Sequence, residues 1–228
     1  MLDLTHQLTD DMPLWPGDPS TVIQSISQEP CSLNYLSFGE HSGTHLGAPA
    51  HYGFAAGITD FPLELMVGTA LFIHCESHAD RPIEQLQLEE ALRAIDDRLA
   101  GQYSLVVVVT GWARLWPSDI YFTGGDLDSP TAPTLLPAGL SPTGLHYLLN
   151  RFSPQIVGID SPNIDFGGAA LGNLECGIEL ARRGLYHLEN IASVPPGLLS
   201  EVDYLLMPLN IRGATGSPVR FVVFDSAF

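Results

Sequence analysis

His41-Ser42-Gly43-Thr44-His45-Leu46-Gly47-Ala48-Pro49-Ala50-His51 carries the strongest signal of fold and chemistry in this chain. It places three imidazoles within eleven residues. Neutral imidazole is the commonest protein ligand for transition metals and the usual proton carrier near neutral pH. The glycines and the proline favour a shaped turn over a long helix. The segment therefore indicates a metal or catalytic site. The alternative is that His41 and His45 form an incidental pair, satisfied by the neighbouring Ser and Thr.

The same segment resembles the signature HxGTHxDxPxH of the cyclase-like metal hydrolases, the family of bacterial kynurenine formamidase and isatin hydrolase. Six of its seven fixed positions match, and Gly47 stands where the signature has aspartate. Other pieces resemble the family in the same order along the chain: Asp3-Leu4-Thr5, Pro13-Leu14-Trp15-Pro16-Gly17-Asp18, Gly158-Ile159-Asp160-Ser161-Pro162, Glu189-Asn190 and Thr215-Gly216-Ser217-Pro218-Val219-Arg220. The resemblance implies a mixed, sheet-rich α/β fold, the swivelling β/β/α cyclase-like single domain, over residues 1–228.

Length and composition agree with one domain and exclude some partners. The chain has 228 residues, 45% of them hydrophobic, enough for one well-buried core. Its net charge of −17 arises from 26 acidic against 9 basic residues, which disfavours nucleic acid and anionic membrane surfaces. We see no secretory signal and no apolar run of membrane-spanning length. Three cysteines without C-x-x-C spacing fit a reducing compartment, so we expect a cytoplasmic protein.

Hydrophobic patterns predict more strands than helices. Short apolar runs predict strands at residues 70–74, 105–110, 155–159, 204–207 and 219–224. The run at 105–109 is continuous, which is typical of a central strand covered on both faces. Helices are predicted at 82–99, from Pro142 onward with Ser141 as its N-cap, and from 173 to the glycine at 184. Residues 116–139 show no period and are predicted to form loops, as a lid, a substrate-facing arm or a subunit contact.

The resemblance also implies a ligand set. Family hydrolases hold one or two divalent metals through the first two motif histidines, the motif aspartate, a histidine on a later helix and the glutamate of the E-N pair. His41, His45 and Glu189 are present, whereas Gly47 replaces the aspartate and residues 175–177 hold no histidine. Glycine cannot bridge two cations, so we expect one divalent ion, zinc or manganese, on His41, His45 and Glu189, or no metal at all.

Other candidate residues have two interpretations each. By resemblance, His51 is the catalytic acid–base that takes a proton from water and returns it to the leaving amine; otherwise it makes a structural hydrogen bond near Tyr52. Trp15 is a substrate-binding wall for aryl groups or a packed core side chain. Glu175 completes the metal site or complements a helix dipole. Cys176 completes the metal site or is a buried small apolar residue.

These features predict a metal-dependent amide or ester hydrolase, with kynurenine formamidase-like cleavage of an N-formyl aryl amine as the nearest named activity. The alternative is a metal-independent or repurposed member that binds or converts a small molecule in the same pocket. By resemblance we also expect a homodimer or higher homo-oligomer. Four further histidines match no family site position and are interpreted as structural or surface residues: His74, His78, His146 and His187. Of these, His187 is noted because it lies two residues before Glu189 and could share a strand face with it.

Overall fold

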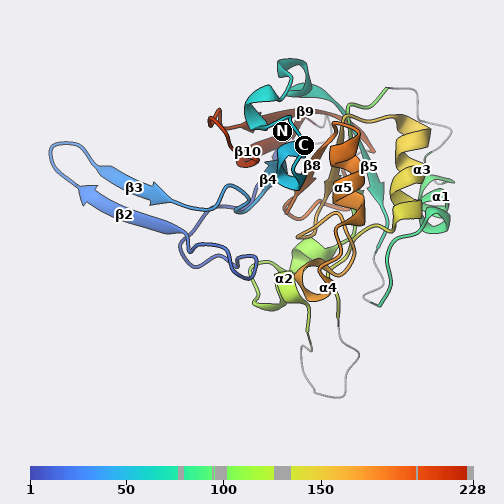
Figure 1. The fold of residues 1–228 in the computed structure, drawn as a ribbon, viewed down its shortest axis with the longest axis horizontal. Coiled ribbons are helices and arrows are strands. Elements are labelled where there is room, and N and C mark those ends of the chain that lie inside the picture. Colours follow the sequence, from blue (N-terminus) through green and yellow to red (C-terminus); the bar gives the residue numbers. More distant parts are fainter. Residues whose placement is uncertain (77–79, 94, 96–101, 126–134, 199, 225–228) are drawn as a thin grey trace.

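A single curled sheet forms the body of the protein (Figure 1). The computed structural model describes residues 1–76, 80–93, 95, 102–125, 135–198 and 200–224. The sheet has the strand order β1-β10-β4-β8-β7-β6-β5-β9, and β10 also pairs with β9, so the sheet closes in a barrel-like manner. Its strands are β1 (Leu2–Asp3), β4 (His45–Gly47), β5 (Val67–His74), β6 (Leu105–Val109), β7 (Ile156–Ile159), β8 (Tyr186–Glu189), β9 (Glu201–Pro208) and β10 (Gly216–Phe224). The sheet-rich α/β fold expected from the resemblance is confirmed.

The five strands predicted from apolar runs are confirmed as β5, β6, β7, β9 and β10. Strands β5, β6, β7 and β8 are parallel neighbours, and every residue of β6 is buried, as its continuous apolar sequence predicts. Alternate residues of this sheet face two cores. Val107 contributes to the core inside the curled sheet, and Val106 contributes to the core beneath the helices.

Helices cover one face of the parallel strands (Figure 1). They are α1 (Gln85–Arg93), α3 (Pro142–Phe152) and α5 (Glu175–Arg182), with the shorter α2 (Ile120–Thr123) and α4 (Gly168–Leu171) near the site. The Ser141 hydroxyl accepts a hydrogen bond from the Gly144 backbone N–H at 3.0 Å, which confirms the N-cap predicted from the Ser-Pro pair. The first predicted helix begins later than expected, and its end at 94 and 96–99 lies outside the described residues.

Two predictions about irregular segments need correction. The turn predicted around the histidine cluster is wrong at its centre, because His45–Gly47 is the buried strand β4, held between β10 and β8. Only its flanks turn, with His51 in a 3₁₀ turn, η1 (Pro49–Tyr52). The loop predicted at 116–139 contains helix α2, and residues 126–134 lie outside the described part. No helix among the described residues is long and apolar enough to cross a membrane.

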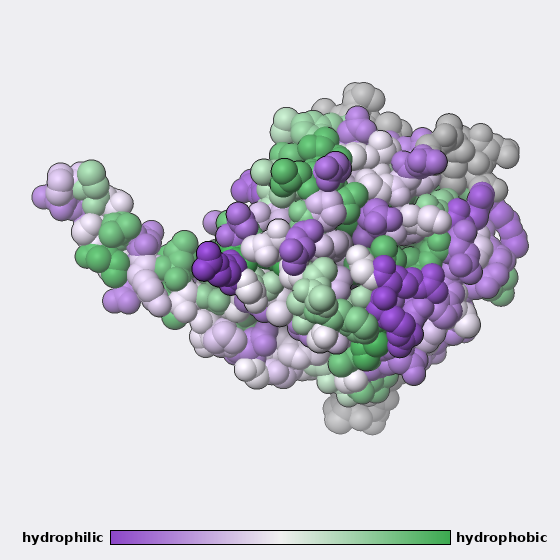
Figure 2. Space-filling view, turned by 45° about the horizontal axis from the view of Figure 1, so that its top comes forward, coloured by the Kyte–Doolittle hydropathy of each residue, from purple (hydrophilic) through white to green (hydrophobic). Residues whose placement is uncertain are grey.

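A two-stranded arm, which the sequence patterns did not predict, projects from the body (Figures 1 and 2). It consists of β2 (Val22–Ser27) and β3 (Leu33–Ser37), which pair with each other in a separate antiparallel sheet. Apolar side chains on it are solvent-exposed, among them Ile26, Leu33 and Leu36, each with 57% of its surface exposed. Two strands alone bury too little apolar surface to be stable in water.

Candidate functional site

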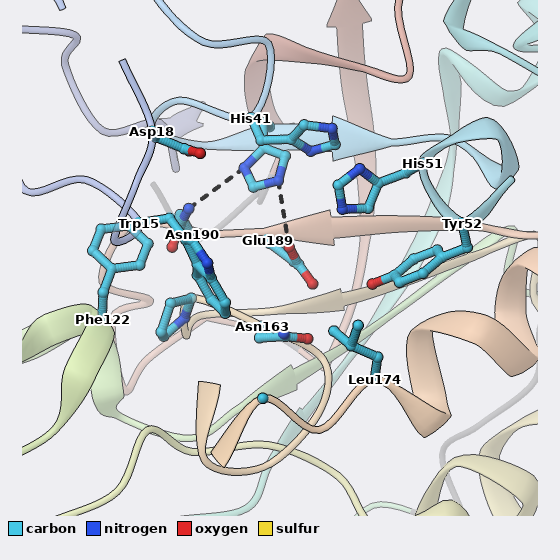
Figure 3. A pocket seen from close by; sticks show the side chains of 13 residues that line it. Trp15, Asp18, His41, His51, Tyr52, Phe122, Asn163, Leu174, Glu189 and Asn190 are labelled. Carbon is cyan, nitrogen blue, oxygen red and sulfur yellow. Dashed lines mark hydrogen bonds and ion pairs between the residues drawn. The ribbon is translucent and has the colours of Figure 1, made fainter. Parts of the chain in front are cut away.

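Five of the candidate site residues line one pocket of about 320 Å³ (Figure 3). They are Trp15, His41, His45, His51 and Glu189. The pocket also includes residues to which the sequence assigned no role of their own: Asp18, Tyr52, Phe122, Pro162, Asn163, Gly172, Leu174 and Asn190. Most of these lie on loops, where no periodic pattern marks a side chain as pocket-facing.

The base of the site is a ladder between the antiparallel strands β4 and β8. His45 pairs with Glu189 and Gly47 pairs with His187, with Leu46 opposite Leu188 between them. Because side chains alternate across a strand, the two leucines point into the inner core and the polar residues point to the other face. This alternation brings His187, which the sequence had only noted, to the same face as Glu189.

The two ring nitrogens of His45 face different polar groups. Its Nδ1 lies 3.0 Å from the Gly43 carbonyl oxygen and 3.4 Å from Asn190 Nδ2. Its Nε2 faces the Glu189 carboxylate at 3.3 Å. With the proton on Nδ1, a cation beside Nε2 offsets the repulsion between its lone pair and the carboxylate; with the proton on Nε2, the ring donates to Glu189 directly. Histidines that bind metals commonly donate their other N–H to a backbone carbonyl, which is the first of these two arrangements.

His41 is oriented in a comparable way. Its Nε2 lies 3.2 Å from the Thr215 hydroxyl, and that hydroxyl donates its single proton to the Glu40 carboxylate. The hydroxyl oxygen therefore accepts from the Nε2–H of His41, which leaves the Nδ1 lone pair of His41 free for a ligand. Burial lowers the pKa of His41, which keeps the ring neutral.

Three histidines can bind one metal ion. Ligand nitrogens of His41, His45 and His187 all lie within 4.8 Å of one another. His187 is 2% exposed, and burial lowers its pKa to about 4, so it carries a lone pair at neutral pH. The sequence signal for His187 was its two-residue offset from Glu189, and the partner glycine on β4 could not be known without the strand register.

Glu189 supplies a buried negative charge. Burial by itself raises the pKa of this carboxyl, but His187, His45 and the Ile164 backbone N–H, 2.9 Å from Oε1, lower it overall. The carboxylate is therefore ionised at neutral pH. None of the described residues lining the pocket is Lys or Arg. A buried anion surrounded by imidazole lone pairs is the chemistry that a divalent cation satisfies, so the residues present fit a metal.

The region where the family pattern has a later histidine is filled by another side chain. A Cβ placed on Gly177 of α5 would lie 2.2 Å from the Tyr52 hydroxyl oxygen, so Tyr52 occupies this position. Cys176 is buried, with its thiol 3.6 Å from the Leu140 carbonyl oxygen, and burial raises its pKa. Glu175 is exposed at the start of α5. Both agree with their structural interpretations.

His51 and Trp15 stand at the pocket margins (Figure 3). The His51 ring centroid lies 4.0 Å from that of His41, and desolvation lowers its pKa, so it is a neutral ring able to accept a proton. Trp15 packs edge-on against Phe122 at 6.1 Å between centroids while lining the pocket, so it both packs and forms a wall. The structure places both side chains in the pocket.

A mixed α/β barrel with a histidine-lined, metal-competent pocket is the class that the fold and the site define. The sequence model of the family named Cyclase, described as "Putative cyclase", matches residues 2–166, and the chain belongs to this family. The kynurenine formamidases of Geobacillus thermodenitrificans and Maricaulis maris are 26% and 27% identical to it, covering 96% and 98% of this chain and 94% and 97% of theirs. An isatin hydrolase solved with the product analogue thioisatinate has the same fold, with a TM-score of 0.81 at 23% identity over 99% of this chain and 92% of that one. The resemblance seen in the motifs is confirmed, and these relatives place the chain among cyclase-like hydrolases.

Proposed function

We propose that this protein hydrolyses a small amide or ester, in the manner of a kynurenine formamidase acting on an N-formyl aryl amine, with one divalent metal as cofactor. The observation that carries the proposal is the convergence of His41, His45, His51 and Glu189 beside the aromatic wall of Trp15 in one pocket. The cysteines of the chain are free, with Cys31 exposed, which supports a reducing compartment such as the cytoplasm.

Each group has a role that its position supports. His41, His45 and Glu189 would hold the metal, which when bound polarises a carbonyl and makes water more acidic. His51 stands beside this cluster as a neutral imidazole that accepts a proton from the attacking water and returns it to the leaving nitrogen. Trp15 and Phe122 offer apolar area for an aryl ring, and His51 and Tyr52 lie across the pocket from them (Figure 3).

The proposal is tested by formate release from N-formylkynurenine and N-formylaniline, with phenyl esters as a second class. We expect turnover by the purified protein, loss after dialysis against a chelator, and recovery with zinc or manganese. Saturable binding of these compounds without any turnover, whatever metal is added, would instead favour the alternative of a repurposed binding pocket. Turnover that survives complete metal removal would contradict the metal dependence.

Replacing His51 with glutamine is expected to lower kcat about 10²-fold or more, because glutamine fills a similar volume but cannot carry a proton at neutral pH. KM should change little, since binding of the aryl group does not depend on proton transfer. The measurement is steady-state kinetics on the best formyl substrate. His74→Gln is the matched control, because His74 lies at the end of β5 and does not line the pocket. Equal losses in both variants would rule out a specific role for His51.

We further propose that the arm pairs with a second copy of this chain in a homodimer. Its strands, with sequences VIQSIS and LNYLS, contain no charged residue, although the whole chain carries a net charge of −17. Two copies would repel over most of their surface, and the uncharged, apolar arm is where contact costs least. Covering the arm would also bury the apolar area that two isolated strands cannot bury alone.

The double variant Leu33→Asp/Leu36→Asp is expected to convert the dimer to monomers, because it places two desolvated charges in the contact. Mass measured by light scattering after size exclusion checks this result. Leu63→Asp is the control, since Leu63 is an equally apolar surface residue on the body rather than on the arm, 73% exposed. A wild-type protein that is monomeric at micromolar concentration would contradict the proposal.

A further inference from the structure

Two glycines and a histidine form one row across three adjacent strands. Gly216 of β10 pairs with Gly47 of β4, and Gly47 pairs with His187 of β8. A Cβ placed on Gly47 would lie 1.9 Å from His187 Nε2 and 2.2 Å from its Cε1. No side chain accepts contacts this short. The imidazole of His187 therefore occupies the space that a side chain at residue 47 would use.

The other glycine of the row serves a second histidine in the same way. A Cβ on Gly216 would lie 2.4 Å from Cε1 of His41. The two glycines form a floor without side chains, and the rings of His41 and His187 lie on it. Neither glycine has a positive φ, so close approach of the rings, rather than a backbone turn, explains the choice of residue.

We propose that His187 supplies the metal ligand that the family signature supplies as an aspartate at residue 47, so that this donor has moved from β4 to the facing position on β8. The inference rests on the proposed function only in treating the pocket as a metal site. A ring nitrogen of His187 and those of His41 and His45 lie within 4.8 Å of one another. Two nitrogens bound to one zinc ion at about 2.0–2.1 Å lie roughly 3.3 Å apart in a tetrahedral site, so binding an ion would draw these rings closer together.

The same geometry predicts one ion per chain. The ligand set implied by the resemblance includes a later histidine, and here Tyr52 fills that region against Gly177. The exchange of a carboxylate for a neutral imidazole also removes one negative charge from the cluster. A site with three imidazoles and Glu189 suits a single divalent cation, whereas two cations would lack the carboxylate that offsets their repulsion.

The competing explanation is that His187 merely fills the gap over Gly47. An apolar side chain would fill that gap without the cost of burying a polar ring, which argues against packing alone. Packing and ligation predict different results for zinc affinity, and zinc affinity can be measured without any substrate.

The experiment compares zinc stoichiometry and affinity, by elemental analysis and by competition with a chromophoric chelator, in five proteins: wild type, His187→Gln, Gly47→Asp, Gly47→Asp/His187→Ala, and His146→Gln. Melting temperatures of the metal-free forms show that each variant folds. His146→Gln is the matched control, because His146 is a half-exposed residue of α3 paired with Glu179. His187→Gln preserves most of the ring volume, so it keeps the fold while removing the imidazole.

We expect about one zinc per wild-type chain and an affinity loss of about 100-fold or more in His187→Gln, at least as large as losses seen when outer groups around a metal are removed. The double variant should recover to within about tenfold of wild type, whereas Gly47→Asp alone should not, because its side chain collides with the ring. Unchanged affinity in His187→Gln, or a double variant no better than His187→Gln, would overturn the inference. Zinc bound through His187 in a protein that hydrolyses nothing would overturn the proposed function alone.

Discussion

Replacement of His45 by alanine is expected to remove bound metal and to lower hydrolysis by about 10³-fold or more. His45 is 3% exposed, and its two ring nitrogens face the Gly43 carbonyl and the Glu189 carboxylate. Removing the ring leaves Glu189 as a buried charge without its neighbour and takes away one of the three clustered nitrogens. Metal content by elemental analysis and formate release from the formyl substrate should fall together.

A melting curve separates this effect from general unfolding. His146→Ala serves as the control, because it removes an imidazole of the same size from the exposed face of α3. It should keep both metal and activity. If His45→Ala stayed folded and retained wild-type metal content and turnover, the metal mechanism would fail.

The largest loss of stability is expected for Asp160→Ala, at about 3–5 kcal/mol in the free energy of unfolding. Asp160 is 1% exposed and directly follows β7. It accepts hydrogen bonds from the Thr110 backbone N–H at 2.7 Å, the Thr110 hydroxyl at 2.6 Å and the Gly111 N–H at 2.9 Å. Alanine leaves these donors of the neighbouring strand end unsatisfied in the interior. Denaturant unfolding followed by fluorescence measures the change.

Two comparisons calibrate that result. Asp160→Asn keeps the shape and one acceptor oxygen, so its loss should be smaller than that of alanine. Asp203→Ala removes an exposed carboxylate whose hydrogen bond to the Thr69 hydroxyl is 3.1 Å long, and it should cost less than about 1 kcal/mol. Equal losses of unfolding free energy in Asp160→Ala and Asp203→Ala would contradict the role of Asp160 as a buried hydrogen-bond acceptor that joins the ends of β6 and β7.

The parts of the fold that were predicted correctly are those whose secondary structure is set by neighbouring residues in the sequence. The continuous apolar run of β6 and the Ser141 cap of α3 each depend on neighbouring residues alone. Strand β4 was missed because its three residues contain a glycine and a histidine, and only pairing with β8 and β10 makes them a strand. The arm was missed for a similar reason, since its pairing is a long-range property with weak alternation.

The site was predictable as far as the family signature reaches. His41, His45, His51, Glu189 and Trp15 were all expected from sequence, and the structure brings them into one pocket, although their individual roles stay predictions. His187 could not be added with confidence to that set from sequence, because its relation to Gly47 exists only across a strand pair. In the proposed site the ligand missing from β4 is replaced by a residue on β8, and a linear motif cannot show such a pairing.

The mutual exclusion of a residue-47 side chain and the His187 ring also constrains the history of this pocket. If the ancestral chain carried the aspartate of the family signature, that carboxylate had to be lost before an imidazole could turn inward from β8. A side chain at residue 47 and an inward-facing imidazole at residue 187 therefore exclude each other, so the two positions act as one unit whenever the donor set of this pocket is changed.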